Sequence, residues 1–166
     1  MKVIKRNDKI INALQLPVIC NLNPRSIYNK SDEFCTLVEQ EEIDVVLMSE
    51  SWERDNKSLE DVIEIEDYKI FSNQSQRRGA GGRPAIIANC KKFEVKDLTN
   101  TVVHIPWGVE AVWCLVSPRI TTPNSKVKKI TCCALYFKPD SRKKNLFFGP
   151  FSRSLQCVVQ KVWPGS

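Results

Sequence analysis

The chain has 166 residues, of which 42% are hydrophobic and 27% are charged, and its formal net charge at pH 7 is +6. This length and balance are typical of one soluble domain with a sizeable core, and they exclude an intrinsically disordered chain. No apolar stretch approaches the roughly 18 residues needed to cross a bilayer, so we expect no contact with a membrane.

The first predicted elements are a strand, a helix and a second strand. Residues 1–15 are basic and then mildly apolar without a signal-peptide core, so we expect an N-terminal extension of an intracellular protein, in the nucleus or the cytoplasm. Residues 16–23 are rich in strand formers. Residues 30–42 carry apolar side chains at helical spacing, and Ser31 is placed to cap the amino end of that helix. Residues 44–50 form an apolar strand, and the strand–helix–strand order predicts a parallel pair.

The rest of the chain is predicted to be mostly a succession of strands. An acidic segment, residues 57–67, is a candidate helix. Strands are predicted at 68–72, 85–90, 92–95, 102–105, 109–117 and 127–137, and a final helix is predicted from about residue 151. This order predicts an α/β fold, an α+β-like mixed sheet with helices packed on it.

The seven cysteines and the single histidine do not form a metal-binding pattern. No Cys-x-x-Cys pair occurs and His104 stands alone, whereas a tetrahedral zinc site requires grouped ligands. We therefore expect no zinc site, reduced thiols that pack as small apolar side chains, and a structural or surface role for His104.

The positive charge is concentrated in the C-terminal half. Residues 1–75 carry 9 Lys and Arg against 15 Asp and Glu, whereas residues 76–166 carry 16 against 4. A basic half could bind a polyanion such as nucleic acid, or it could be no more than a solvated surface.

Polar side chains end the first two predicted strands. Asn21 and Asn23 end the first strand, and Ser49 and Glu50 end the second. Because the carboxyl ends of parallel strands line the crevice where α/β sheets bind ligands, we expect an amide and a carboxylate to meet there. Such oxygens suit Mg²⁺, which predicts metal-assisted phosphodiester chemistry. The alternative is that Glu50 is simply solvated at a strand end.

Four motifs follow one another along the chain. They are NPRSIYNK (23–30), DVVLMSESW (44–52), GAGGRPAIIAN (79–89) and ALYFKP (134–139). Together they resemble the endonuclease/exonuclease/phosphatase superfamily, and within it the endonuclease domain of non-LTR retrotransposon (reverse transcriptase) polyproteins. The resemblance covers roughly residues 16–165. It implies a four-layer α/β sandwich and a Mg²⁺-dependent endonuclease that nicks target DNA by phosphodiester hydrolysis.

The resemblance also implies site residues. Glu50 matches the metal-binding Glu. Asn23 matches the Asn that helps to hold the metal and orient the phosphate, with Asn21 as an alternative because the register is loose. Tyr136 matches the Tyr whose hydroxyl reaches the scissile phosphate, although a ring simply packed at a strand end is the alternative. Basic residues in or beside the motifs and in the preceding loop are expected to contact nucleic acid; they are Arg25, Arg77, Arg78 and Lys138.

The chain departs from the family pattern after its last motif. Relatives continue into a Gly-Asp-Phe-Asn-like segment and a Ser-Asp-His-like segment, which position the nucleophile and supply the general base, and these 166 residues contain neither. We therefore expect residues 16–166 to be a partial domain, an incomplete sandwich with weak or absent Mg²⁺ binding. One apolar sheet face should lack its cover and favour self-association.

Three hypotheses about function follow. The first is a DNA-nicking endonuclease that is complete only with residues absent here. The second, which the departures favour, is a C-terminally truncated and catalytically incompetent remnant of such an enzyme. The third is a non-catalytic basic module that binds nucleic acid. Lipid phosphodiesterases and inositol phosphatases of the same superfamily fit the wording of the motifs less well.

Overall fold

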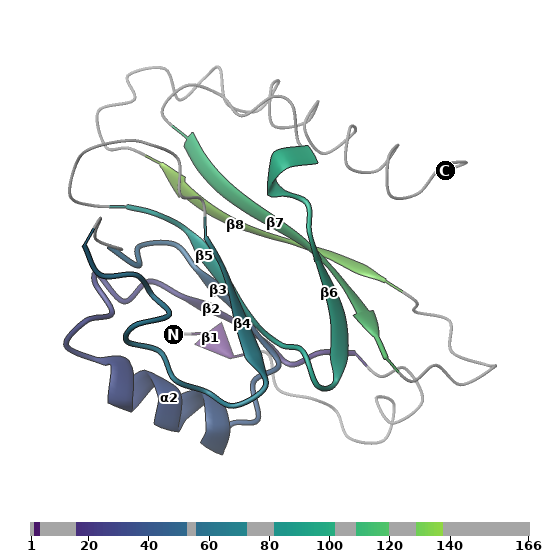
Figure 1. The fold of residues 1–166 in the computed structure, drawn as a ribbon, viewed down its shortest axis with the longest axis horizontal. Coiled ribbons are helices and arrows are strands. Elements are labelled where there is room, and N and C mark those ends of the chain that lie inside the picture. Colours follow the sequence, from purple (N-terminus) through teal and green to yellow (C-terminus); the bar gives the residue numbers. More distant parts are fainter. Residues whose placement is uncertain are drawn as a thin grey trace.

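The computed structural model shows a mixed α/β fold made mostly of strands (Figure 1). The residues that it describes are 2–3, 16–52, 56–72, 82–101, 109–119 and 129–137. The predicted strand at 102–105, with His104, and the predicted C-terminal helix lie outside these residues. Within the described part of the chain, no helix is long and apolar enough to span a membrane.

The predicted strand–helix–strand unit is confirmed. β2 (Ile19–Leu22) and β3 (Val45–Met48) are parallel neighbours, and α2 (Ser31–Gln40) connects them. α2 buries Phe34 and Val38, which share one face of the helix.

The first sheet is mixed and is ordered β1-β2-β3-β5-β4. Its four longer strands are β2, β3, β4 (Tyr68–Ser72) and β5 (Ala85–Asn89), and β5 is antiparallel to both β3 and β4. The two-residue β1 (Lys2–Val3), from the expected N-terminal extension, pairs with the edge of β2.

The second sheet is antiparallel and is ordered β6-β7-β8. It consists of β6 (Phe93–Asp97), β7 (Val109–Pro118) and β8 (Ile130–Phe137), and the short 3-10 turn η1 (Thr99–Thr101) follows β6. Three strands of a second sheet therefore come from this chain.

Alternate side chains of the central strands fill two separate cores. Val46 and Met48 of β3 pack with α2 in the first core, whereas Val45 packs with Val112 of β7 in the core between the two sheets. The layers are thus α2, the mixed sheet and the antiparallel sheet. β3 is covered on both faces, as its continuous apolar sequence predicted.

The outer face of β7 is also buried. Ala111, Trp113 and Leu115 are each less than a tenth exposed and pack with Leu98. The backbone N–H of Leu98 donates to the carbonyl oxygen of Trp113 (2.8 Å), and the N–H of Trp113 donates to Oγ1 of Thr99 (3.1 Å). The expected uncovered apolar face is therefore not found on β7, and self-association stays a prediction.

The six cysteines of the described residues are free thiols. Burial raises the pKa of Cys132 to about 11 and that of Cys133 to about 12, and burial also raises the pKa of Cys114 strongly. These thiols stay protonated at neutral pH and pack as small apolar side chains.

Two local predictions are wrong. Residues 57–67 do not form a helix, although Leu59 and Ile63 are both buried at helical spacing. The carbonyl oxygen of Leu59 accepts hydrogen bonds from Val62 (3.1 Å) and Ile63 (2.9 Å), which closes a single turn that is not continued. Ser31 is the first residue of α2 rather than its cap, and no side chain caps that end by a hydrogen bond.

Candidate functional site at the tips of β2 and β3

The structure brings Asn23 and Glu50 together. β2 and β3 are parallel with Leu22 opposite Met48, so their carboxyl ends reach the same edge of the sheet. Nδ2 of Asn23 donates a hydrogen bond to Oε1 of Glu50 at 3.0 Å. Asn21, the alternative, lies within β2 opposite Leu47.

Backbone hydrogen bonds hold the loop after β2 against the end of β3. The N–H of Ser49 donates to the carbonyl oxygen of Leu22 (3.0 Å), the N–H of Ser26 donates to that of Glu50 (3.2 Å), and the N–H of Ile27 donates to that of Ser51 (3.2 Å). This ladder continues the pairing of the two strands beyond β2. It fixes the backbone on both sides of the Asn23–Glu50 contact.

The segment before β5 is fastened to the same edge. The carbonyl oxygen of Arg83 accepts hydrogen bonds from the N–H (3.2 Å) and Oγ (2.7 Å) of Ser51, and that of Gly82 accepts one from the N–H of Trp52 (3.1 Å). On its other side, the N–H of Arg83 donates to Oε2 of Glu110 at 3.2 Å. Gly82 and Arg83 therefore bridge the tip of β3 and the start of β7.

Tyr136 lies against this bridge. It stands directly opposite Glu110 in the register of β7 and β8. A Cβ on Gly82 would come within 3.0 Å of three atoms of the Tyr136 ring, so only glycine leaves room for that ring. Burial raises the pKa of Tyr136, and the negative charges of Glu50 and Glu110 raise it further. The Tyr136 hydroxyl therefore stays protonated at neutral pH and is able to donate a hydrogen bond beside Glu50.

Strained backbone is concentrated at this edge. Of the six non-glycine residues with positive φ in the described part of the chain, four belong to the segments just described. Such residues persist only where the surrounding contacts hold them, and they cluster at functional sites. The four are Arg25 (49°), Ser26 (87°), Trp52 (58°) and Arg83 (57°).

The donor set fits a weakly held Mg²⁺ rather than a closed metal cage. Glu50 is the carboxylate at the strand tips, and the described residues include no group of three His, Cys, Asp or Glu able to hold a metal. The carbonyl oxygen of the Asn23 side chain accepts the N–H of Arg25 (3.1 Å), which together with the hydrogen bond to Glu50 fixes the orientation of the Asn23 amide. An amide oxygen has two lone pairs, so the expected role of Asn23 at the metal stays a prediction. Mg²⁺ commonly binds one or two carboxylates, keeps several waters and completes its shell with substrate phosphate oxygens.

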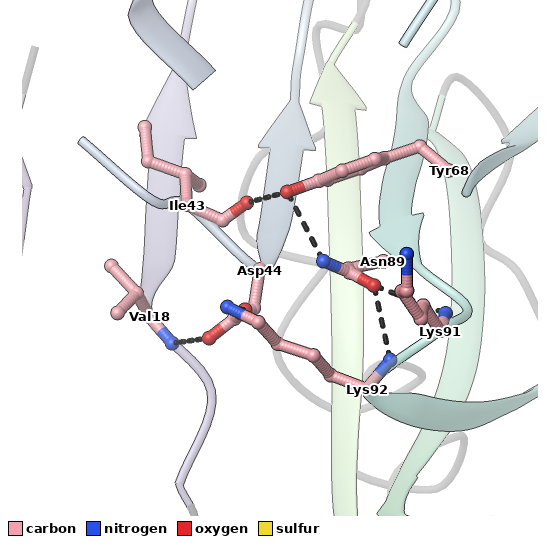
Figure 2. A network of polar contacts seen from close by, with 7 residues as sticks. All are labelled: Val18, Ile43, Asp44, Tyr68, Asn89, Lys91 and Lys92. Carbon is pink, nitrogen blue, oxygen red and sulfur yellow. Dashed lines mark hydrogen bonds and ion pairs between the residues drawn. The ribbon is translucent and has the colours of Figure 1, made fainter. Parts of the chain in front are cut away.

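The opposite end of β3 carries a second carboxylate with a different character (Figure 2). Asp44 is fully buried, and its Oδ2 accepts the N–H of Val18 (2.9 Å) while its Oδ1 binds Nζ of Lys92 (3.0 Å). Both oxygens are thus occupied by groups of the protein itself. This carboxylate fastens β2 to β3 and is not open to a ligand.

The rest of the network in Figure 2 is equally closed. The hydroxyl of Tyr68 donates to the carbonyl oxygen of Ile43 (2.7 Å) and accepts from Nδ2 of Asn89 (3.4 Å). Oδ1 of Asn89 accepts the N–H groups of Lys91 (3.0 Å) and Lys92 (3.1 Å), which closes the turn between β5 and β6. We infer that the polar residues at this end of the sheet stabilise the fold and do not bind a ligand.

The remaining predicted site residues are distributed as follows. Arg25 is exposed and belongs to the loop that carries Asn23. Arg77, Arg78 and Lys138 lie outside the described residues. Sequence reasoning missed Gly82 and Glu110, although the Gly-Gly turn before β5 was a usable signal for the first. The position of Glu110 opposite Tyr136 depends on the register of β7 and β8, which the sequence pattern does not predict.

Comparison of the chain with family models, with curated proteins and with solved structures finds no match in any of the three. The function of this edge is therefore inferred from its geometry and from the motifs.

Proposed function

We propose that the edge formed by Asn23, Glu50 and Tyr136 is the metal- and phosphate-binding part of a Mg²⁺-dependent DNA endonuclease site. The observation that carries this proposal is the 3.0 Å hydrogen bond from Asn23 to Glu50 where two parallel strands end. The order of α2 and two face-to-face sheets supports a partial four-layer sandwich of the endonuclease/exonuclease/phosphatase type.

Each residue has a distinct role in this proposal. Glu50 would hold Mg²⁺, which polarises the phosphoryl group and stabilises the leaving oxygen when it is bound. Asn23 fixes the Glu50 carboxylate by its hydrogen bond. Tyr136 would donate from its hydroxyl to a phosphate oxygen, because burial and, after it, the negative charges of Glu50 and Glu110 raise the pKa of Tyr136 and keep the hydroxyl protonated.

The 166 residues by themselves are proposed to bind a phosphodiester without cleaving it. The described residues around Glu50 include no histidine, and the second carboxylate at this edge, that of Glu110, accepts the N–H of Arg83 rather than orienting a base. A missing general base alone lowers the rate by roughly 10²–10⁴. Because the motifs of residues 16–139 are not followed by the family's Asp/Asn and Asp/His segments, we propose that these residues are a catalytically incompetent remnant of such a site, and a purely basic nucleic-acid-binding module is the alternative.

Replacing Glu50 with Gln tests the proposal. Calorimetric titration of Mg²⁺ should show weak binding that strengthens when a dinucleotide phosphodiester is present, because the phosphate completes the metal shell. We expect Glu50→Gln to weaken that binding at least about tenfold. Glu39→Gln, an exposed glutamate of α2, is the matched control and should leave the titration unchanged.

Plasmid nicking in Mg²⁺ or Mn²⁺ separates the three hypotheses. No nicking is expected from the 166 residues, and Glu50-dependent nicking would instead make them a working enzyme. Equal metal binding by the wild type and Glu50→Gln would contradict the proposed site. DNA binding that depends on salt but not on Glu50 or metal would favour the basic module.

A further inference from the structure

Trp52 is a large apolar side chain exposed beside the candidate site. It is 42% exposed and follows Glu50 by two residues. Among the described residues, Phe137 is the other large hydrophobic side chain that is exposed, at 41%. An indole exposed to this extent next to the proposed phosphate-binding edge presents apolar aromatic surface that could contact a ligand.

The position of Trp52 is fixed by its backbone. Its φ of 58° is unusual for a bulky residue, and its N–H is held by the carbonyl oxygen of Gly82 at 3.1 Å. The preceding Ser51 is fastened through both its N–H and its hydroxyl to Arg83. These contacts fix the backbone position from which the indole projects beside the candidate site.

A positive charge lies on the neighbouring loop of the same edge. Arg25 is exposed, has a φ of 49°, and precedes Ser26, whose N–H donates to the carbonyl oxygen of Glu50. An aromatic surface combined with a cation beside a phosphate site is the pattern that binds unpaired nucleotides. The net charge of +6 comes from residues 76–166, whereas residues 1–75 carry 9 Lys and Arg against 15 Asp and Glu, so Arg25 and not the net charge is the cation that favours an anion at this edge.

We infer that Trp52 stacks on an unpaired nucleobase next to the phosphodiester at Glu50, with Arg25 contacting an adjoining phosphate. This inference rests on the proposed function and adds what that function left open, namely that the bound strand is locally unpaired at this point. An indole stacks on any base, so the contact favours single-stranded or opened nucleic acid without reading its sequence.

Phe137 provides a matched control. It follows Tyr136 on β8, and successive side chains of a strand point to opposite faces of the sheet. Phe137 is about as exposed as Trp52. Because it follows Tyr136 directly on the strand, its side chain points away from the face that Tyr136 occupies. Its replacement should not affect a base stacked at Trp52.

Fluorescence anisotropy with two short single-stranded oligonucleotides tests the inference. One carries bases, and the other carries abasic sites and the same number of phosphates. Trp52→Ala should weaken binding of the first by roughly 5- to 150-fold and leave binding of the second unchanged, since only the first loses a stacked base. Trp52→Phe should keep most of the affinity, and Phe137→Ala should change neither oligonucleotide.

The same measurement distinguishes the inference from the proposed function. In the presence of EDTA the anisotropy measurement does not depend on metal. A base-dependent loss of affinity in Trp52→Ala should therefore still appear there, even if Glu50 binds no metal. Equal losses for both oligonucleotides would overturn the inference, because they would show a phosphate or structural effect. The inference would also be overturned if Trp52→Ala weakened the binding of neither oligonucleotide. It would likewise be overturned if the protein proved to be a dimer that Trp52→Ala dissociates, because the indole would then belong to the contact between two copies.

Discussion

Replacing Gly82 with alanine is expected to destabilise the fold by about 2–5 kcal/mol and to displace Tyr136. The φ of Gly82 is +79°, a conformation that costs an L-residue roughly 1–2 kcal/mol. The added methyl group would also overlap the ring of Tyr136, and such overpacking adds about 1–3 kcal/mol. Urea denaturation followed by tryptophan fluorescence gives the change in the free energy of unfolding.

The two contributions to the Gly82 effect can be separated in the background of Tyr136→Ala. Without the ring, Gly82→Ala should retain only the backbone cost of roughly 1–2 kcal/mol. The difference between the two backgrounds measures the contact itself. The same loss with and without the ring would show that Gly82 does not support Tyr136.

Asp44→Ala is the second large effect, expected to cost about 2–4 kcal/mol and to lower Tm by roughly 5–15 °C. The substitution leaves the N–H of Val18 without its carboxylate acceptor in a buried place. The Lys92 ammonium loses a partner too, but its side chain is 46% exposed and can turn to water. The cost is therefore smaller than for a fully buried ion pair. Thermal unfolding followed by circular dichroism measures it.

Two further variants sharpen this test. Asp44→Asn keeps an oxygen for the Val18 N–H and should recover about half of the lost stability. Asp67→Asn removes the charge of an ion pair with Lys91 that is exposed on both sides, and it keeps a short polar side chain that tolerates the φ of 66° at this position, so it should have no measurable effect. A drop in Tm for Asp67→Asn as large as that for Asp44→Ala would contradict the stabilising role of the buried carboxylate.

Much of the fold follows from local sequence patterns. β4 lies at its predicted bounds, and β3 is the buried strand that its unbroken apolar run predicted. These patterns work because alternation and helical spacing report which face of an element is buried. Helical spacing led to a wrong prediction at Leu59 and Ile63. A single isolated turn buries two apolar side chains four residues apart, as a helix would.

The sequence predicted only the part of the candidate site whose position follows from the direction of the strands, namely Asn23 and Glu50. Asn23 and Glu50 meet because parallel strands end at one edge, which the strand–helix–strand order implies. The support from Gly82 and Glu110 depends on how a loop returns to the sheet and on the β7–β8 register, and neither follows from local patterns. Trp52 likewise has a positive φ and an exposed side chain, and neither follows from the local sequence pattern.

Mapping the binding of Mn²⁺ by nuclear magnetic resonance tests the metal site most directly. A paramagnetic ion at Glu50 should broaden the amide signals of residues 23–26, 49–52 and 82–83 and the side-chain amide of Asn23, and a phosphodiester should strengthen the effect. Glu50→Gln should remove the broadening. Broadening that survives this substitution, or that centres on Asp44 at the opposite end of β3, would contradict a metal site at the tips of β2 and β3.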